Sequence, residues 1–83
     1  MVKQQQPEIR TKKQIGRSLK KVRLQFKMTV KYLSKITQLS RLTIKATEAG
    51  LRYPDLVHLI ALQQHADLND VKFSLKEVVY KWH

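Results

Sequence analysis

Residues 28–50 read MTVKYLSKITQLSRLTIKATEAG, a pattern that predicts two short helices joined by a tight turn. Thr29 can cap a first helix over residues 30–37 with its hydroxyl group, and Ser40 can cap a second helix over residues 41–48. Each of these helices is about eight residues long, and the turn between them is short. Such a pair is typical of a helix-turn-helix motif.

Helical patterns continue on both sides of this pair. Thr11 and Gln14 have the spacing of a capping box, which predicts that a helix begins there. Gly50 can take the positive φ that ends a helix, and Pro54 suits the first turn of a further helix. The apolar residues expected to face inward are Ile15, Leu19, Val22 and Phe26 in the first helix, and Leu33 and Ile36 in the second. In the last helix they are Leu56, Leu59, Ile60 and Gln63, with Val57 and Leu62 flanking.

The two ends of the chain follow other patterns. Residues 1–10 contain a glutamine run and Pro7 without periodicity, which predicts a flexible basic arm. Residues 71–83 form a tail in which Val71, Phe73 and Leu75, and later Val78, Tyr80 and Trp82, alternate with other residues. Period two predicts one or two strands, and a lone strand must pair with a neighbouring segment, a second copy or another protein. Residues 11–70 then form the single folded domain.

The composition narrows the class of protein. The 83 residues include 17 Lys and Arg against 6 Asp and Glu, for a net charge of +11, and no Cys. The absence of Cys excludes disulfides, thiolate zinc sites and iron–sulfur clusters. Apolar runs are too short for a membrane span, and the polar N-terminus does not resemble a secretory signal. We therefore expect a soluble protein of the cytoplasm.

The positive charge is concentrated in one part of the chain. Residues 1–52 hold 14 Lys or Arg and only two acids, whereas residues 53–83 hold three Lys and four acids. Such a distribution favours a polyanion as partner, above all nucleic acid. An anionic membrane surface is the rival partner.

Residues 16–68 resemble the Cro/cI-type helix-turn-helix repressors, also called the xenobiotic-response-element-like family. The resemblance rests on Leu19-Lys-Lys-Val22-Arg23, Met28 to Ser34, Leu39 to Ile44, Glu48-Ala49-Gly50 and Pro54-Asp55-Leu56. It implies an all-α, compact four- to five-helix domain like that of lambda repressor, with the strand-like tail added. It also implies a nucleoid-associated regulator of transcription that binds double-stranded DNA as a homodimer.

The resemblance places the helix over residues 41–48 in the major groove. The residues it assigns to base contacts are Arg41, Leu42, Lys45 and Ala46. Arg41 can form two hydrogen bonds to guanine. Leu42 either contacts a thymine methyl group or packs in the core. Lys45 is either a solvated charge or a phosphate contact. Phosphate contacts are expected from Arg17, Lys20, Lys27, Thr29, Val30, Lys31, Ser40, Thr43 and Arg52, and from Arg10, Lys12 and Lys13 of the arm.

At other positions the resemblance implies a structural role, or the sequence differs from the pattern of the family. The resemblance implies an ion pair between Arg23 and Glu48 that holds the recognition helix. Gln38 stands where the family has a turn glycine, and it would be strained if that position needs positive φ. Val30 replaces a common Gln, and Thr47 replaces an aliphatic residue.

Catalytic and metal-binding interpretations have little support in the sequence. His58 and His65 lie seven residues apart without a third ligand nearby, so we expect structural or surface histidines and neither a metal nor a cofactor. The main prediction is a sequence-specific repressor that acts by occupying its operator, with residues 71–82 forming a dimer or binding a partner. The alternative is an antitoxin that binds a protein toxin and regulates its own operon. A basic module for RNA or membrane surfaces is a third possibility.

Overall fold

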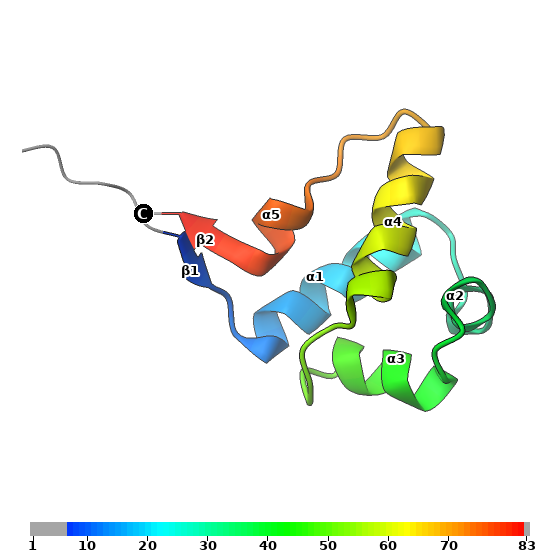
Figure 1. The fold of residues 1–83 in the computed structure, drawn as a ribbon, viewed down its shortest axis with the longest axis horizontal. Helices are drawn as coiled ribbons and strands as arrows, with labels where there is room; N and C mark the ends of the chain where they lie inside the picture. Colours follow the sequence, from blue (N-terminus) through cyan, green and yellow to red (C-terminus); the bar gives the residue numbers. More distant parts are fainter. Residues whose placement is uncertain (1–6, 83) are drawn as a thin grey trace, which may run out of the picture.

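The computed structural model describes residues 7–82 and is mostly helical (Figure 1). The described residues form five helices and one two-stranded sheet, whose strands are the first and last elements. In order they are β1 (Pro7–Ile9), α1 (Lys12–Gln25), α2 (Val30–Thr37), α3 (Arg41–Glu48), α4 (Leu56–Leu68), α5 (Leu75–Val79) and β2 (Tyr80–Trp82). The predicted helical class is confirmed, and the small sheet is an addition to it.

The starts of α1, α2 and α3 are set by side-chain caps. Thr11 accepts a hydrogen bond from the Gln14 amide at 3.1 Å, and the Gln14 side chain accepts one from the Thr11 amide at 2.9 Å, as the capping box predicts. Thr29 accepts from the Tyr32 amide at 3.0 Å, and Ser40 caps α3 in the same way. The predicted bounds of α2 and α3 are therefore confirmed.

Left-handed residues shape the chain after α2 and α3. Gly50 has a φ of 79° after α3, as predicted, and a Cβ there would lie 2.7 Å from the Cα atom of Lys13. Gln38 has a φ of 60° after α2, so this position does need the left-handed conformation that strains a glutamine. The Ser34 hydroxyl donates to the Leu39 carbonyl at 2.5 Å and ties α2 to this turn.

The core is formed where α1, α2, α3 and α4 meet, with α5 contributing one residue. Its buried apolar residues are Ile15, Leu19, Met28, Leu33, Ile44, Ala61, Leu62 and Val78, with Val22 and Phe26 packed against them. The prediction that Ile36 faces inward is wrong, because its side chain is 43% exposed. Thr37 is buried instead, and its hydroxyl donates to the Leu33 carbonyl at 2.6 Å, which satisfies the group inside the core.

The predicted start and inner face of α4 are both corrected. Pro54 lies before the helix, since Asp55 occupies the N-cap position and Leu56 is the first helical residue. The inward-facing residues are His58, Ala61, Leu62 and Ala66, with Leu59 packed at the edge of the core. Leu56 and Ile60, which were expected inside, are exposed. The apolar residues of α4 are distributed around the helix and not along one side, so periodicity could not select its buried face.

The N-terminal arm and the C-terminal tail pair with each other. β1 and β2 are antiparallel, with Glu8 opposite Lys81, so residues 7–9 of the predicted flexible arm are an ordered strand. The Arg10 amide donates to the Val79 carbonyl at 2.8 Å, which extends the connection. Residues 1–6 of the predicted arm and His83 of the tail lie outside the described residues.

Most of the predicted strand over residues 71–82 is wrong, because only Tyr80–Trp82 are extended in a sheet. Leu75, Val78 and Val79 also have the i, i+3, i+4 spacing of a helix. The single turn of α5 bonds its own backbone and buries Val78, whereas a strand would leave backbone groups unpaired. Within residues 7–82, none of the helices has the length and hydropathy to cross a membrane.

Candidate nucleic-acid interface

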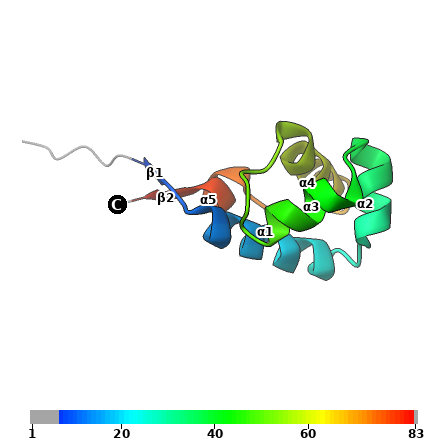
Figure 2. The same cartoon turned by 90° about the horizontal axis from the view of Figure 1, so that it is seen from below.

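The helix α3 has one buried side and one side open to solvent. Ile44 and Thr47 are buried, and the Thr47 hydroxyl donates to the Thr43 carbonyl at 2.9 Å. Arg41 and Lys45 are exposed, and Leu42 is 80% exposed, which excludes the interpretation of Leu42 as a core residue. Seen from below, α3 lies toward the viewer between α1 and α2 (Figure 2). The base-contact residues predicted at the start of α3 are therefore accessible.

The remaining predicted contacts on α3 are less accessible. Ala46 and Thr43 are half-buried. Ser40 is exposed, but its hydroxyl caps the Thr43 amide at 3.0 Å and lies 2.9 Å from the Thr43 hydroxyl. Arg41, Leu42 and Lys45 are thus the three longer side chains that α3 presents to solvent.

Arg23 and Glu48 do form an ion pair, and it anchors α3 to α1. Arg23 Nε donates to one Glu48 carboxylate oxygen at 2.6 Å and Nη2 donates to the other at 3.1 Å. Arg23 Nη1 also donates to the Met28 carbonyl at 2.8 Å, ahead of α2. Both side chains are buried, so the forked geometry of the guanidinium fixes the relative positions of three segments in a site shielded from water.

Gly16 allows α1 and α3 to approach closely, a role that the sequence analysis missed. A Cβ atom at Gly16 would lie 2.8 Å from the Glu48 carbonyl oxygen and still closer to that of Thr47. A glycine inside the helical pattern of residues 12–25 was the available signal, because glycine is unfavourable there unless packing requires it.

A surface depression of about 300 Å³ lies between α1, α2 and α3. Lys20 of α1 and Lys45 of α3 line it together with Val30, the first residue of α2, and with Ala49 and the paired Arg23 and Glu48. The free amides at a helix N-terminus and two nearby ammonium groups suit a phosphate. The structure thus brings together three of the residues predicted for DNA contacts.

The other predicted phosphate residues differ in availability. Arg17, Lys27, Lys31 and Thr29 are exposed, although the Thr29 hydroxyl already caps α2. Arg52 is partly engaged, since its guanidinium lies 3.1 Å from the Asp55 carboxylate.

The three arm residues assigned to phosphate lie elsewhere than predicted. Arg10 Nε donates to the Glu77 carbonyl at 3.1 Å, so this side chain joins the N-terminal segment to α5. Lys12 and Lys13 belong to the first turn of α1 and not to an arm. The Lys12 ammonium lies 5.3 Å from the centre of the Tyr53 ring, which is a cation–π distance.

His58 is a core residue beneath the ion pair. It is fully buried, and neither ring nitrogen has a hydrogen-bond partner among the described residues. Burial lowers the pKa of His58 below 6.5, the nearby carboxylates of Glu48 and Asp55 oppose that change, and Arg23 adds to it. The ring therefore packs as a neutral group.

The described residues contain no cluster of three His, Asp or Glu that could hold a metal ion. No protein-family model matches the chain, and no curated protein is similar to it at a significant level.

Proposed function

We propose that the chain is a sequence-specific double-stranded DNA-binding protein that regulates transcription, most simply as a repressor. In this proposal α2, its turn and α3 act as a helix-turn-helix, with α3 in the major groove. The observation that carries the proposal is the free, exposed start of α3, whose opposite side is buried in the core. The resemblance of residues 16–68 to Cro/cI-type regulators supports the same interpretation.

Arg41 and Leu42 supply chemistry suited to reading bases. A guanidinium group donates two parallel hydrogen bonds to O6 and N7 of guanine, which discriminates by about 1–3 kcal/mol against another base. An exposed leucine contacts the thymine methyl group, the one apolar feature of the major groove. Leu42 gains little packing within the described chain, because it is 80% exposed.

Phosphate binding is assigned to the cations around α3. Lys20 and Lys45 flank the start of α2, and Lys31 is exposed in the first turn of that helix. These groups neutralise phosphates, orient the protein and contribute most of its affinity for any sequence. The net charge of +11 favours rapid, salt-dependent association with DNA. In this proposal the protein regulates transcription by occupying an operator in the nucleoid, without catalysis.

The test is selection of duplexes from a random DNA pool at near-physiological salt, where non-specific binding is weakened. Enrichment of a defined sequence is the expected result. Arg41→Ala should then lower affinity for the selected site by about 1–3 kcal/mol and relax the preference at one base pair.

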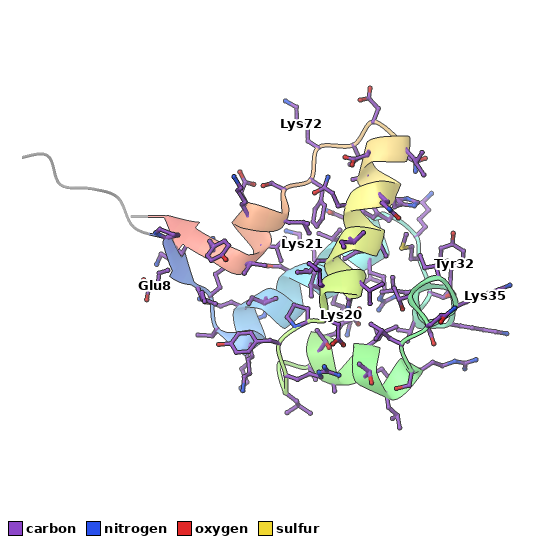
Figure 3. All side chains as sticks on the ribbon, in the orientation of Figure 1. Glu8, Lys20, Lys21, Tyr32, Lys35 and Lys72 are labelled. Carbon is purple, nitrogen blue, oxygen red and sulfur yellow. The ribbon has the colours of Figure 1, made fainter. Side chains whose placement is uncertain are left out.

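Lys72→Ala is the matched control, since it removes one positive charge at the end of the molecule opposite α3 (Figure 3). This variant should bind the selected duplex nearly as well as the unmodified protein. If the pool yields no enriched sequence, or if both variants weaken binding equally on every duplex, α3 is not the recognition helix.

A further inference from the structure

His58 is an exception among the buried polar side chains of the described residues. The hydroxyl groups of Thr37 and Thr47 donate to backbone carbonyls, and all three nitrogens of the Arg23 guanidinium donate hydrogen bonds. The imidazole of His58 is 0% exposed, and neither ring nitrogen has a hydrogen-bond partner in the part of the chain that the structure describes. Buried polar groups without partners are rare and costly, so this ring calls for a functional explanation.

Three charged groups act on the His58 ring, each from a different part of the fold. Arg23 belongs to α1, Glu48 ends α3, and Asp55 occupies the N-cap position of α4. Burial and Arg23 favour the neutral ring, whereas the two carboxylates favour the charged ring. Of the carboxylates, Glu48 acts more strongly, and Asp55 also pairs with Arg52. The titratable residues of α2, which also packs on α4, are exposed to solvent: Lys31, Tyr32 and Lys35.

The carboxylate of Glu48 can accept a further hydrogen bond. Arg23 donates one bond to each oxygen, at 2.6 Å and 3.1 Å, and a carboxylate oxygen has two acceptor positions. A neutral imidazole has one N–H group, whereas a protonated imidazole has two and no acceptor. A proton taken from solvent therefore turns His58 into a buried cation that needs an acceptor, and the Glu48 carboxylate is the anion that acts on it most strongly.

Glu48 is also the residue that fixes α3 to α1. It is the last residue of α3, and its side chain and that of Arg23 are only 6% and 8% exposed. Two cations that share one buried carboxylate repel each other, so a charged His58 weakens the pair between Arg23 and Glu48. The position of α3 on α1 then depends on the protonation state of His58.

We propose that His58 is a proton-sensitive switch for α3. With a neutral ring, the pair between Arg23 and Glu48 holds α3 on α1 and presents its exposed start to DNA. With a protonated ring, the imidazolium competes with Arg23 for Glu48, α3 is held less firmly, and sequence-specific binding weakens. The inference rests on the proposed DNA-binding function and adds acidification as its regulator. His58 does not contact DNA in this proposal, and it acts as a positioning residue through Glu48.

The first experiment contains no DNA and no variant. NMR spectroscopy of the full chain between about pH 7.5 and about pH 5 follows the ring signals of His58 and the Nε–H signal of Arg23, and circular dichroism reports whether the helices remain folded. Both signals should change with one midpoint below pH 6.5 while the chain is folded. A His58 ring that stays neutral until the chain unfolds, or an Arg23 signal that does not follow the ring, would overturn the proposal.

The second experiment measures affinity for the duplex selected in the DNA test and for a scrambled duplex, at both ends of this pH range and at constant salt. The ratio of the two affinities separates recognition by α3 from the general gain in positive charge at low pH. For the unmodified chain this ratio should fall at least about threefold, within the limit of about tenfold per pH unit that one linked proton sets. His58→Leu should keep the ratio constant, because leucine binds no proton.

His65→Gln is the matched control, since it removes a titratable ring from the same helix, where the ring centre of His65 lies 4.7 Å from that of Phe26. Its affinity ratio should fall like that of the unmodified chain. A ratio that does not change with pH in the unmodified chain, or an equal fall in His58→Leu, would refute the switch. If no duplex is selected, the proposed DNA function fails, and the first experiment still decides whether His58 acts on the pair.

Discussion

Removing the carboxylate of Glu48 should destabilise the fold strongly. Arg23 and Glu48 have side-chain exposures of 8% and 6%, and two hydrogen bonds join them. Hydrogen bonds to charged groups contribute about 1.5–3 kcal/mol each, and breaking one side of a buried ion pair typically costs 3–5 kcal/mol. For Glu48→Gln we expect a loss of about 3–4 kcal/mol, because the amide keeps one acceptor oxygen but leaves the buried guanidinium without a counter-charge. A chain of 83 residues has a total stability of about 4–12 kcal/mol.

The assay is unfolding in urea followed by circular dichroism, with a double-mutant cycle over Arg23→Met and Glu48→Gln. The double variant should be clearly more stable than the sum of the two single losses predicts, because neither charge is then left alone. The pair formed by Arg52 and Asp55 is the internal control, since its side chains are 41% and 38% exposed and its contribution should be at most about 1 kcal/mol. A loss below about 1 kcal/mol for Glu48→Gln would refute the argument that the pair anchors α3.

Three further changes test other features of the fold. Gly16→Ala should destabilise the fold by at least about 2 kcal/mol, because the added methyl group meets the carbonyl oxygens of Thr47 and Glu48. Thermal unfolding measures this loss, and an unchanged melting temperature would contradict the close packing of α1 on α3. Gln38→Gly should raise the free energy of unfolding, measured in urea, by about 0.5–1 kcal/mol, since glycine accepts a φ of 60° without strain. A loss of stability would mean that the contacts of the Gln38 side chain contribute more than its backbone strain costs. Because the pKa of His58 is lowered in the folded protein, the unfolded chain takes up a proton on His58 at a higher pH than the folded chain does. The stability due to neutral His58 is therefore present above pH 6.5. It declines as the pH falls below that value, by at most about 1.4 kcal/mol per pH unit. His58→Leu should flatten that part of the stability profile between pH 7.5 and 5.5, and an equal slope in both proteins would exclude His58 as its source.

The parts of the fold that sequence reasoning predicted are those controlled by local chemistry. Thr11, Thr29 and Ser40 each cap a helix through their own hydroxyl group, so the starts of α1, α2 and α3 depend on residues at most three positions apart. The same holds for Gly50, whose φ follows from its place after α3. Within the candidate site, the local pattern predicted where α3 begins, whereas the expectation that its first residues face solvent came from the resemblance to Cro/cI-type regulators.

The remaining features depend on contacts between distant residues. Ile60 was expected inside and is exposed, and His58, expected as a structural or surface residue, is buried. The apolar residues of α4 are spread around the helix, so only the approach of the other helices decides which side is covered. Arg10 and Glu77 are 67 positions apart, and no local sequence pattern near either residue predicts their hydrogen bond. For Leu42 the sequence left two environments open, and only the packing of α3 separates them.

The exposed leucines of this protein stand in different chemical surroundings. Leu42 stands between Arg41 and Lys45, where a dry protein contact would have to bury cations, so its surroundings suit a ligand that is itself anionic and carries isolated methyl groups. Ile60 and Leu68 are exposed on α4, which holds no Lys or Arg and carries the exposed Asp67. An anionic ligand, such as the DNA of the proposed function, is therefore expected at Leu42 and not at α4.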